Sequence, residues 1–337
     1  MKFIAYLRFP MLLGLMVNIC AYAQVNTLRL AHFLPATAKV HTDFLIPWKE
    51  SIEAQSNGSL QIELYPAQTL SKADKIYDAT TKGLASIGVT AQGYRNGRFP
   101  LSQIVELPGI AQNSMHGSCI LQKLYDSGAL EQEYNDTHVL FMFTTTPALL
   151  HTIKKPIKSP SDLKGLRIRR PTAVAGEILQ NLGASPISLT APDIYTALQR
   201  GVIDGLTFPW EALDTFKLAE LISYHTDLPL YTLSFVATMN KNTYDKLSAQ
   251  EKEIIDAHSG LEWALKMGAV FDEVDAQSKQ QILSLGQEIT AVEGGIEHPD
   301  WQAPLRQSIA QYLQQIGEEG EKVYALAQSF AQQCPTQ

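Results

Sequence analysis

The sequence predicts an α/β protein with two domains, and three observations support this fold class. The chain has 337 residues, enough for two domains with sizeable cores. Strand-like and helix-like segments alternate, most clearly over 161–213, and this alternation is typical of a parallel sheet covered by helices. Two similar segments, 76–90 and 194–208, indicate that one structural unit occurs twice.

The segment 161–213 is expected to place several side chains at the ends of strands. Pro171 and Thr172 open a helix after the first strand, and Gly183 closes it. The strands are expected at 166–169, 186–189 and 202–208, and a second helix at 192–200. Ligands of open parallel sheets bind outside the carboxyl ends of the strands. Arg169 lies at one such end, and Phe208 and Trp210 lie at another, so they are expected to share a crevice.

The two similar segments each predict a helix, a glycine stop and a strand. They align without a gap and share an Ile-Tyr pair, an alanine and a basic residue followed by glycine. Tyr94 follows the first copy as Trp210 follows the second, so each of two lobes would supply one wall of a cleft. A chance match is the alternative, because helix–glycine–strand junctions are common.

The N-terminus has the pattern of a secretory signal peptide. Lys2 and Arg8 precede a short apolar run, and a small-x-small triplet ends at Ala23. The pattern predicts a leader over 1–23, cut after Ala23, and a soluble secreted mature chain. Cys20 suggests a lipoprotein as an alternative, but the preceding Ile19 is bulkier than lipidation sites favour.

The mature chain is acidic and keeps two cysteines. Without Lys2 and Arg8, 25 basic residues face 34 acidic ones, a net charge of −9. No basic patch with interleaved aromatic residues occurs, so nucleic acid is not an expected partner. Cys119 and Cys334 either form a disulfide in the oxidising periplasm or remain as two thiols.

The rest of the chain continues the alternation. Strands are expected at 28–33, 60–65, 84–90, 139–145 and 231–240, and helices at 44–54, 73–82, 116–124, 304–316 and 319–332. The strands 139–145 and 231–240 are expected to cross between the lobes. Ser248 and Glu251 form a capping box that opens a long amphipathic run through Val274, and spanning both lobes would explain its length.

Motifs for metal, cofactor and enzymatic chemistry do not occur in the sequence. The eight histidines show no HxxxH or HxH pairing, and there is no CxxC, GxSxG, P-loop or GxGxxG motif. No metal, cofactor or catalytic residue is therefore expected. His151 is interpreted as structural, with ligand binding as the alternative.

Three segments resemble the periplasmic substrate-binding subunits of tripartite ATP-independent periplasmic (TRAP) transporters, in their dicarboxylate-receptor branch. They are KPIKSPSDLKGLRIRRP, LGASPISLTAPDIYTALQRGVIDG and FVATMNKNTYDKLSAQEKEIID. The resemblance implies a two-domain periplasmic binding protein fold with hinge-linked lobes and a long helix spanning both. It also implies one organic-acid ligand in the interdomain cleft, delivery to a membrane permease, and a monomer.

The resemblance and the expected elements together give domain boundaries. These are the signal peptide 1–23, domain I at 24–146 plus about 235–274, domain II at 147–234 plus about 275–300, and C-terminal helices packed on the lobes at 301–337.

Arg169 is the expected anchor of the ligand. In the family, the arginine of the segment after LKG binds the ligand carboxylate, and here it is Arg169. Independently, a guanidinium offers a planar pair of donors suited to a carboxylate. The alternative is a surface arginine paired with an acid. Arg167 and Arg170 are interpreted as solvent-exposed or domain-surface charges.

Departures from the family pattern suggest a ligand less polar than a dicarboxylate. Ala148 stands where many members have a second arginine, Phe208 where asparagine is frequent, and Phe33 where a polar residue is usual. With Tyr94 and Trp210 they favour a monocarboxylate with an apolar or aromatic body. The alternative for Phe33 and Phe208 is a place in the core of a lobe.

Three further residues complete the predicted site, namely Thr146, Thr172 and Glu211. Glu211 would accept a hydrogen bond from a ligand hydroxyl or amine, or else be an exposed acid at a helix start. Two other functions remain as alternatives: a sensor that presents its closed form to a membrane receptor, and a periplasmic enzyme on the same scaffold.

Overall fold

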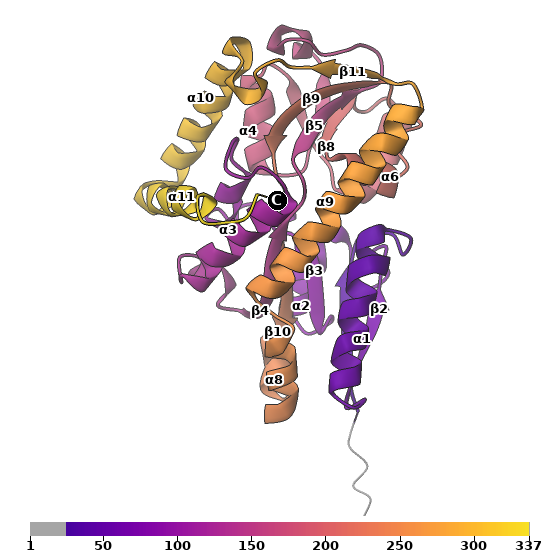
Figure 1. Cartoon of the computed structure of the whole chain (residues 1–337), viewed down its shortest axis with the longest axis vertical. Coiled ribbons are helices and arrows are strands. Elements are labelled where there is room, and N and C mark those ends of the chain that lie inside the picture. The colour runs from indigo at the N-terminus through magenta and orange to yellow at the C-terminus, as the bar shows by residue number, and fades with distance from the viewer. Residues whose placement is uncertain (1–24, 337) are drawn as a thin grey trace, which may run out of the picture.

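The computed structural model describes residues 25–336, so the predicted leader lies outside the described residues. Two β-sheets, one above the other in Figure 1, form the centres of two lobes, and both are covered by helices. The mixed α/β architecture with two lobes confirms the predicted fold class.

The first lobe is built on a five-stranded sheet of order β2-β1-β3-β10-β4. Its strands are β1 (Asn26–His32), β2 (Leu60–Tyr65), β3 (Ile87–Ala91), β4 (Thr137–Thr144) and β10 (Ser234–Asn240). β1 pairs in parallel with β2 and β3, whereas β10 runs antiparallel to β3 and β4. The strand β10 thus returns to the first lobe after the chain has passed through the second.

The second lobe is built on a six-stranded sheet of order β11-β9-β5-β8-β6-β7. Its strands are β5 (Ala148–Thr152), β6 (Arg167–Arg170), β7 (Ser185–Ser188), β8 (Gly205–Phe208), β9 (Tyr224–Tyr231) and β11 (Glu288–Ala291). β6 pairs in parallel with β7 and β8, as the alternation over 161–213 predicts. β5 pairs antiparallel with β8 and β9.

The helices of the first lobe and of the crossing segments are α1 (Ile46–Gln55), α2 (Ile76–Thr81), α3 (Ser114–Asp126), α7 (Lys241–Asp245), α8 (Ala249–Ala257) and α9 (Leu261–Ser284). The second lobe carries α4 (Ala173–Asn181), α5 (Ile194–Gln199) and α6 (Trp210–Thr215), and the chain ends with α10 (Pro299–Ile316) and α11 (Glu318–Ala331). Both copies of the similar segments form a helix, a glycine turn and a strand, namely α2–β3 and α5–β8.

Helix α9 spans both lobes. It packs on α3 and β4 of the first lobe and on α6 of the second (Figure 1). The carboxylate of Asp272 accepts the backbone N–H groups of Ser114 and Met115, which start α3. One turn further on, Asp275 accepts the backbone N–H of Glu211 in α6 at 2.9 Å. Because carboxylates stabilise helix N-termini, these two side chains hold α9 to a helix of each lobe.

Two sequence-based expectations need correction. The amphipathic run after Ser248 is two helices, because the chain turns at Gly260, whose φ of +75° only glycine adopts readily. The capping box at Ser248 and Glu251 is present at the start of α8. The expected strand 231–240 is also divided, since β9 ends at Tyr231 in the second lobe and β10 starts at Ser234 in the first.

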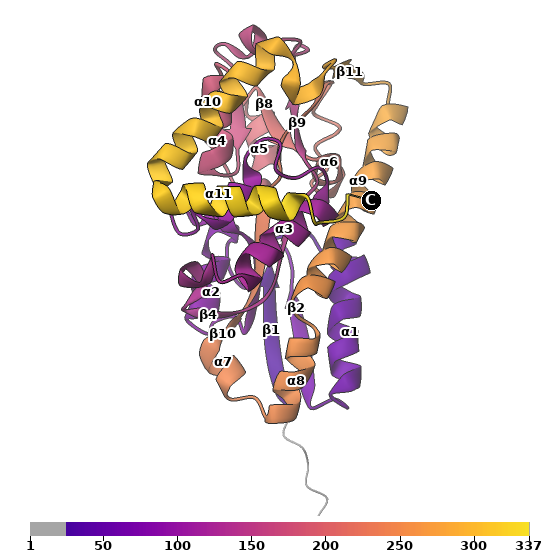
Figure 2. The same ribbon diagram turned by 60° about the vertical axis from the view of Figure 1, so that its left-hand side comes forward.

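The C-terminal helices connect the two lobes from another side. α10 packs against α4, and α11 packs against α3, which Figure 2 shows behind it. Of the two alternatives for the cysteines, the structure has the disulfide, which joins Cys119 of α3 to Cys334 just after α11.

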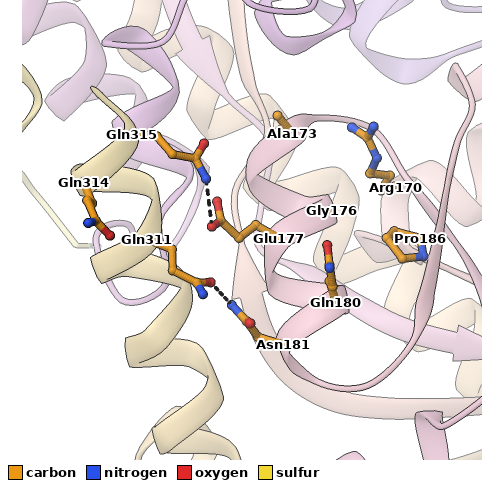
Figure 3. A pocket seen from close by; sticks show the side chains of 10 residues that line it. All are labelled: Arg170, Ala173, Gly176, Glu177, Gln180, Asn181, Pro186, Gln311, Gln314 and Gln315. Carbon is orange, nitrogen blue, oxygen red and sulfur yellow. Dashed lines mark hydrogen bonds between the residues drawn. The ribbon is translucent and has the colours of Figure 1, made fainter. Parts of the chain in front are cut away.

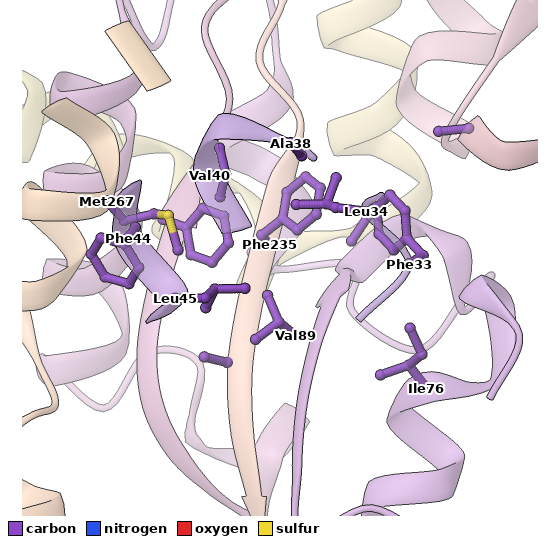
Figure 4. Close-up of a cluster of buried hydrophobic side chains, with 14 of the residues drawn as sticks. Phe33, Leu34, Ala38, Val40, Phe44, Leu45, Ile76, Val89, Phe235 and Met267 are labelled. Atoms are coloured by element: carbon purple, nitrogen blue, oxygen red, sulfur yellow. The ribbon is translucent and has the colours of Figure 1, made fainter. Parts of the chain in front are cut away.

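An aromatic and aliphatic cluster connects the first sheet to the cleft between the lobes. Phe33 and Phe235 have ring centroids 5.9 Å apart, and a π-helical turn at Val40–Leu45 adds Phe44 beside Met267 of α9 (Figure 4). Phe143 stacks on Phe235 at 5.1 Å. The cluster fixes the side chains that form the floor of the cleft.

Candidate functional site

Arg169 is completely buried and has no acidic partner among residues 25–336. Its side chain is 0% exposed, and no carboxylate of the described residues lies within 4.0 Å of it. Nε donates to the carbonyl of Leu189 at 2.9 Å, and Nη1 donates to the carbonyl of Thr207 at 3.3 Å. An unpaired buried cation is costly, so this arrangement suits an anion that enters from outside.

Two aromatic side chains enclose the guanidinium of Arg169. Its central carbon lies 4.9 Å from the ring centroid of Phe208, a cation–π geometry. Nη2 donates to the hydroxyl of Tyr94 at 3.3 Å, and the same hydroxyl accepts the backbone N–H of Ala191 at 3.0 Å. Tyr94 follows β3 of the first lobe, whereas Arg169 and Ala191 belong to the second, so the lobes are in contact here.

A small cavity lies against these aromatic side chains. Its lining comes from both lobes and from α9, and it consists of Phe33, Leu34, Tyr94, Thr145, Ala191, Phe208, Pro209, Glu211, Ala212, Phe216, Leu233, Phe235 and Phe271. Arg169 lies behind Tyr94 and Phe208 rather than in the wall. The cavity is therefore mostly apolar, with a cation directly behind two of its aromatic rings.

Four predicted site residues line this cavity: Tyr94, Phe208, Phe33 and Glu211. Phe33 and Phe208 also belong to the hydrophobic core, so these two side chains are part of the core and of the cavity wall at the same time. Glu211 is 5% exposed, so the interpretation as an exposed acid does not hold. Burial, followed by the charge of Asp275, raises the pKa of Glu211 to about 8.

Trp210 and His151 lie one layer behind the cavity. Trp210 is 2% exposed and packs on the imidazoles of His151 and His225, with centroids 5.3 and 4.8 Å away. Nε2 of His151 donates to the carbonyl of Phe208 at 2.9 Å. Burial lowers the pKa of His151 to about 3, so the ring is neutral. His151 thus holds the backbone of a wall residue, as its structural interpretation expects.

The two predicted threonines have different positions. Thr146 is buried between β4 and β5, and its neighbour Thr145 is the one that lines the cavity. Thr172 caps α4, since its hydroxyl accepts the N–H of Ala175 at 3.2 Å. The same hydroxyl donates to Glu106 of the first lobe at 2.8 Å.

Glu106 is a buried residue of this region that the sequence reasoning missed. Its carboxyl group also accepts the N–H and the hydroxyl of Ser234, where the chain returns to the first lobe. Burial raises its pKa to about 7. An acid placed between Val105 and Leu107 was the available signal, because charged residues flanked by apolar ones are often buried with partners.

A wider groove lies on the surface between α4 and α10, and Figure 3 shows its lining. Gln315 donates to Glu177 and Asn181 donates to Gln311, so hydrogen bonds cross the groove from α10 to α4. Arg170 stands at its edge, where its aliphatic stem covers Gly176. This groove is open and polar and does not include Arg169, so the enclosed aromatic cavity is the better candidate site.

The described residues contain no group of three or more His, Cys, Asp or Glu side chains placed to hold a metal ion. Over 25–336, no helix combines the length and the apolar character needed to cross a membrane.

Solved structures of TRAP solute-binding proteins are similar to this chain over nearly its whole length. One from a marine metagenome, specific for aromatic acids and complexed with 3-hydroxybenzoate, is 32% identical with a TM-score of 0.89, and the match covers 93% of this chain and 100% of that one. One from Rhodoferax ferrireducens, with copurified benzoate, is 31% identical with a TM-score of 0.86, covering 92% and 98%. One from Bordetella bronchiseptica, with bound mandelate, is 26% identical with a TM-score of 0.83, covering 91% and 99%.

The family model of the bacterial extracellular solute-binding proteins, family 7, matches residues 30–319. This match and the structural similarity confirm the resemblance seen in the three sequence segments. The chain therefore belongs to family 7 of the bacterial extracellular solute-binding proteins and is a TRAP solute-binding protein.

Proposed function

We propose that this protein binds an aromatic monocarboxylate between its lobes and delivers it to a TRAP permease. The buried, unpaired guanidinium of Arg169 carries this proposal. A single cation matches one carboxylate, whereas a dicarboxylate would bring a second charge into a mostly apolar cavity. A second carboxylate would need a second cation. The position where many family members have a second arginine is Ala148 on β5, and its methyl group cannot pair with an anion.

The ligand carboxylate would replace the hydroxyl of Tyr94 as the partner of Arg169. Tyr94 and Phe208 separate the guanidinium from the cavity, so a small shift of the Tyr94 ring would bring the two together. The ring of the ligand would then pack among Phe33, Phe235 and Phe271. Trp210, Thr146 and Thr172 would support these side chains from behind.

The ligand class is also supported by the relatives. The proteins with 3-hydroxybenzoate, benzoate and mandelate all bind acids that have one carboxylate and one aromatic ring. Two of them share about a third of their residues with this chain. Their ligands agree with an anchor of one arginine and walls of aromatic rings.

The lobes would open and close about the segments that cross between them. In this motion, domain I would comprise 24–146 plus about 235–274, and domain II would comprise 147–234 plus about 275–300. The C-terminal segment 301–337 would pack on both domains. Closure would bring Thr172 to Glu106, and it would bring Tyr94 over the region of Arg169, where the ligand carboxylate takes the place of the tyrosine hydroxyl. A monomer secreted to the periplasm after cleavage at Ala23, with no catalytic activity, completes the proposal.

Binding to a panel of organic acids tests the proposal. The mature chain would be unfolded, dialysed and refolded to remove copurified ligand, and then titrated calorimetrically with benzoate, 3-hydroxybenzoate, mandelate, succinate and glucuronate. Aromatic monocarboxylates should bind at micromolar concentration or below, and raise the melting temperature. Tighter binding of succinate or glucuronate than of any aromatic acid would overturn the proposed ligand class.

A further inference from the structure

We propose that Glu211 selects for a hydroxyl group on the aromatic body of the ligand, so that hydroxylated aromatic monocarboxylates are the preferred ligands. The inference rests on the proposed function and refines it. Benzoate and 3-hydroxybenzoate in the relatives leave open whether a ring hydroxyl matters for this chain. The hydrogen bonds of the side chains that line the cavity favour a ligand with a ring hydroxyl.

Three lining side chains carry polar groups, and two of these are already hydrogen-bonded. The hydroxyl of Tyr94 accepts from Arg169 and from the backbone of Ala191. The hydroxyl of Thr145 donates to the carbonyl of Thr146 and accepts the N–H of Leu233. Tyr94 thus keeps only its O–H proton, and the proton of Thr145 is already engaged, so neither hydroxyl offers both a donor and an acceptor to a polar substituent of a ligand.

Glu211 is the third lining side chain with a polar group, and one of its carboxyl oxygens has no hydrogen-bond partner among the described residues. Oε2 accepts the hydroxyl of Thr215 at 3.3 Å, while Oε1 makes no hydrogen bond within residues 25–336. The residue is held in place through its backbone, whose N–H donates to Asp275 at 2.9 Å. A carboxyl oxygen without a hydrogen-bond partner among these residues, on a side chain that is 5% exposed in a mostly apolar wall, fits a ligand that brings the partner.

The protonation of Glu211 matches a phenolic hydroxyl rather than a cation. Its pKa is raised to about 8 by burial and by the neighbouring carboxylates of Asp275 and Asp214, so the group is neutral at pH 7. A neutral carboxyl group offers one O–H donor and a carbonyl acceptor, and a phenol offers the same pair. The neutral form also avoids repulsion of the ligand carboxylate, which an ionised Glu211 would cause.

Two substitutions of similar size separate this role from simple packing. Glu211→Gln keeps a neutral donor and acceptor at the same position, whereas Glu211→Leu removes both. Benzoate, 3-hydroxybenzoate and 4-hydroxybenzoate would be titrated calorimetrically into the wild type and both variants at pH 7, after refolding without ligand. Circular dichroism and thermal unfolding would verify that each variant is folded.

We expect the wild type to bind at least one hydroxybenzoate about tenfold more tightly than benzoate, as one buried hydrogen bond gives. Glu211→Gln should keep the preference, and in Glu211→Leu the ratio of the Kd values should fall to about one. Equal affinities in the wild type would overturn the inference even if the Leu variant did not fold, and so would a preference that persists in Glu211→Leu. Failure of the wild type to bind any of the three acids would instead overturn the proposed function on which the inference rests.

Discussion

The hydroxyl of Tyr94 lies 3.3 Å from Nη2 of Arg169, and this contact joins the two lobes at the cavity wall. Tyr94 comes from the segment after β3 and Arg169 from β6, 75 residues apart in the chain. The tyrosine thus covers a cation that has no acidic partner in the described chain. A ligand carboxylate would be a stronger partner than a neutral hydroxyl, because it adds the attraction of opposite charges and can accept two N–H groups of the guanidinium at once.

Removing the cation should weaken binding strongly. Arg169→Ala is expected to cost about 1.5–3 kcal/mol of binding free energy, a loss of roughly 10- to 100-fold in the Kd for an aromatic acid. Arg167→Ala is the matched control, because Arg167 is on the same strand but is exposed and paired with Asp204 at 2.9 Å. Calorimetric titration compares them, and equal Kd values in the two variants would rule out Arg169 as the anchor.

Gly93 should be needed for closure. A Cβ at this position would lie 2.2 Å from Cγ2 of Thr172 on the opposite lobe, closer than atoms can approach. Gly93→Ala should therefore leave the protein folded but weaken ligand binding at least tenfold, because the lobes cannot meet. Adding Thr172→Ser removes Cγ2 and keeps the capping hydroxyl, but Cβ of residue 172 still lies 2.7 Å from the added methyl group, so the double variant should recover affinity only in part. Small-angle scattering with ligand would detect the open form, and a fully closed Gly93→Ala complex would refute this role.

Two buried carboxyl groups should make stability fall at neutral to alkaline pH. The pKa values of Glu106 and Glu211 are raised to about 7 and about 8. The folded chain then keeps protons that the unfolded chain releases, so their stabilisation is present at low pH and is lost as pH rises through the folded pKa. Burial lowers the pKa of five histidines from an ordinary 6.5, and they destabilise the fold below about pH 7.5, where their unfolded imidazoles bind protons; they are His32, His41, His138, His151 and His225.

The window above about pH 7.5 therefore isolates the carboxyl groups, and Glu211, with a pKa of about 8, titrates furthest into it. Thermal unfolding of the ligand-free protein should show a falling melting temperature across it, with at most about 1.4 kcal/mol per pH unit for each group. Glu211→Gln should flatten the slope in this window. Glu262→Gln is the control, because that exposed carboxyl has a pKa lowered by Lys266 and titrates below the window. If the melting temperature falls equally steeply with pH in the wild type and in Glu211→Gln, the assignment of this pH dependence to Glu211 is wrong.

The disulfide should stabilise the fold without affecting binding. Cys119 and Cys334 are 215 residues apart, so their bond closes a long loop in the unfolded chain. Replacing both with serine should lower the free energy of unfolding by about 2–5 kcal/mol, measured in urea. The Kd for an aromatic acid should not change, because neither cysteine lines the cavity. An unfolding midpoint that is the same with and without a reductant would show that the bond contributes nothing.

Local patterns predicted the elements that position the anchor. The strands β6, β7 and β8 follow from apolar runs between glycine and proline signals, and they place Arg169 at a strand end. The patterns missed β5, β9 and β11. β5 is buried along its whole length and so shows no alternation, β9 contains Pro229, and β11 has only four residues at the edge of the sheet. The break before α9 was also missed, although Ser259-Gly260 was visible, because the apolar stripe continues across it.

The cavity wall was only partly predictable. Tyr94, Phe33 and Phe208 could be placed because each lies at the end of a predicted strand. Phe235 and Phe271 come from the first residues of β10 and from the apolar stripe of α9, where nothing local distinguishes a cavity wall from a core. Trp210 and Glu211 are adjacent in sequence, yet successive positions of a helix point in different directions. Trp210 therefore faces the core, and Glu211 faces the cavity.

The most direct test of the account is the position of a ligand carboxylate. A crystal structure of the refolded protein with 3-hydroxybenzoate should show the carboxylate within hydrogen-bond distance of the guanidinium of Arg169, with the ring between Phe33, Phe208 and Phe235. A carboxylate bound elsewhere, with the contact between Tyr94 and Arg169 unchanged, would contradict the central claim.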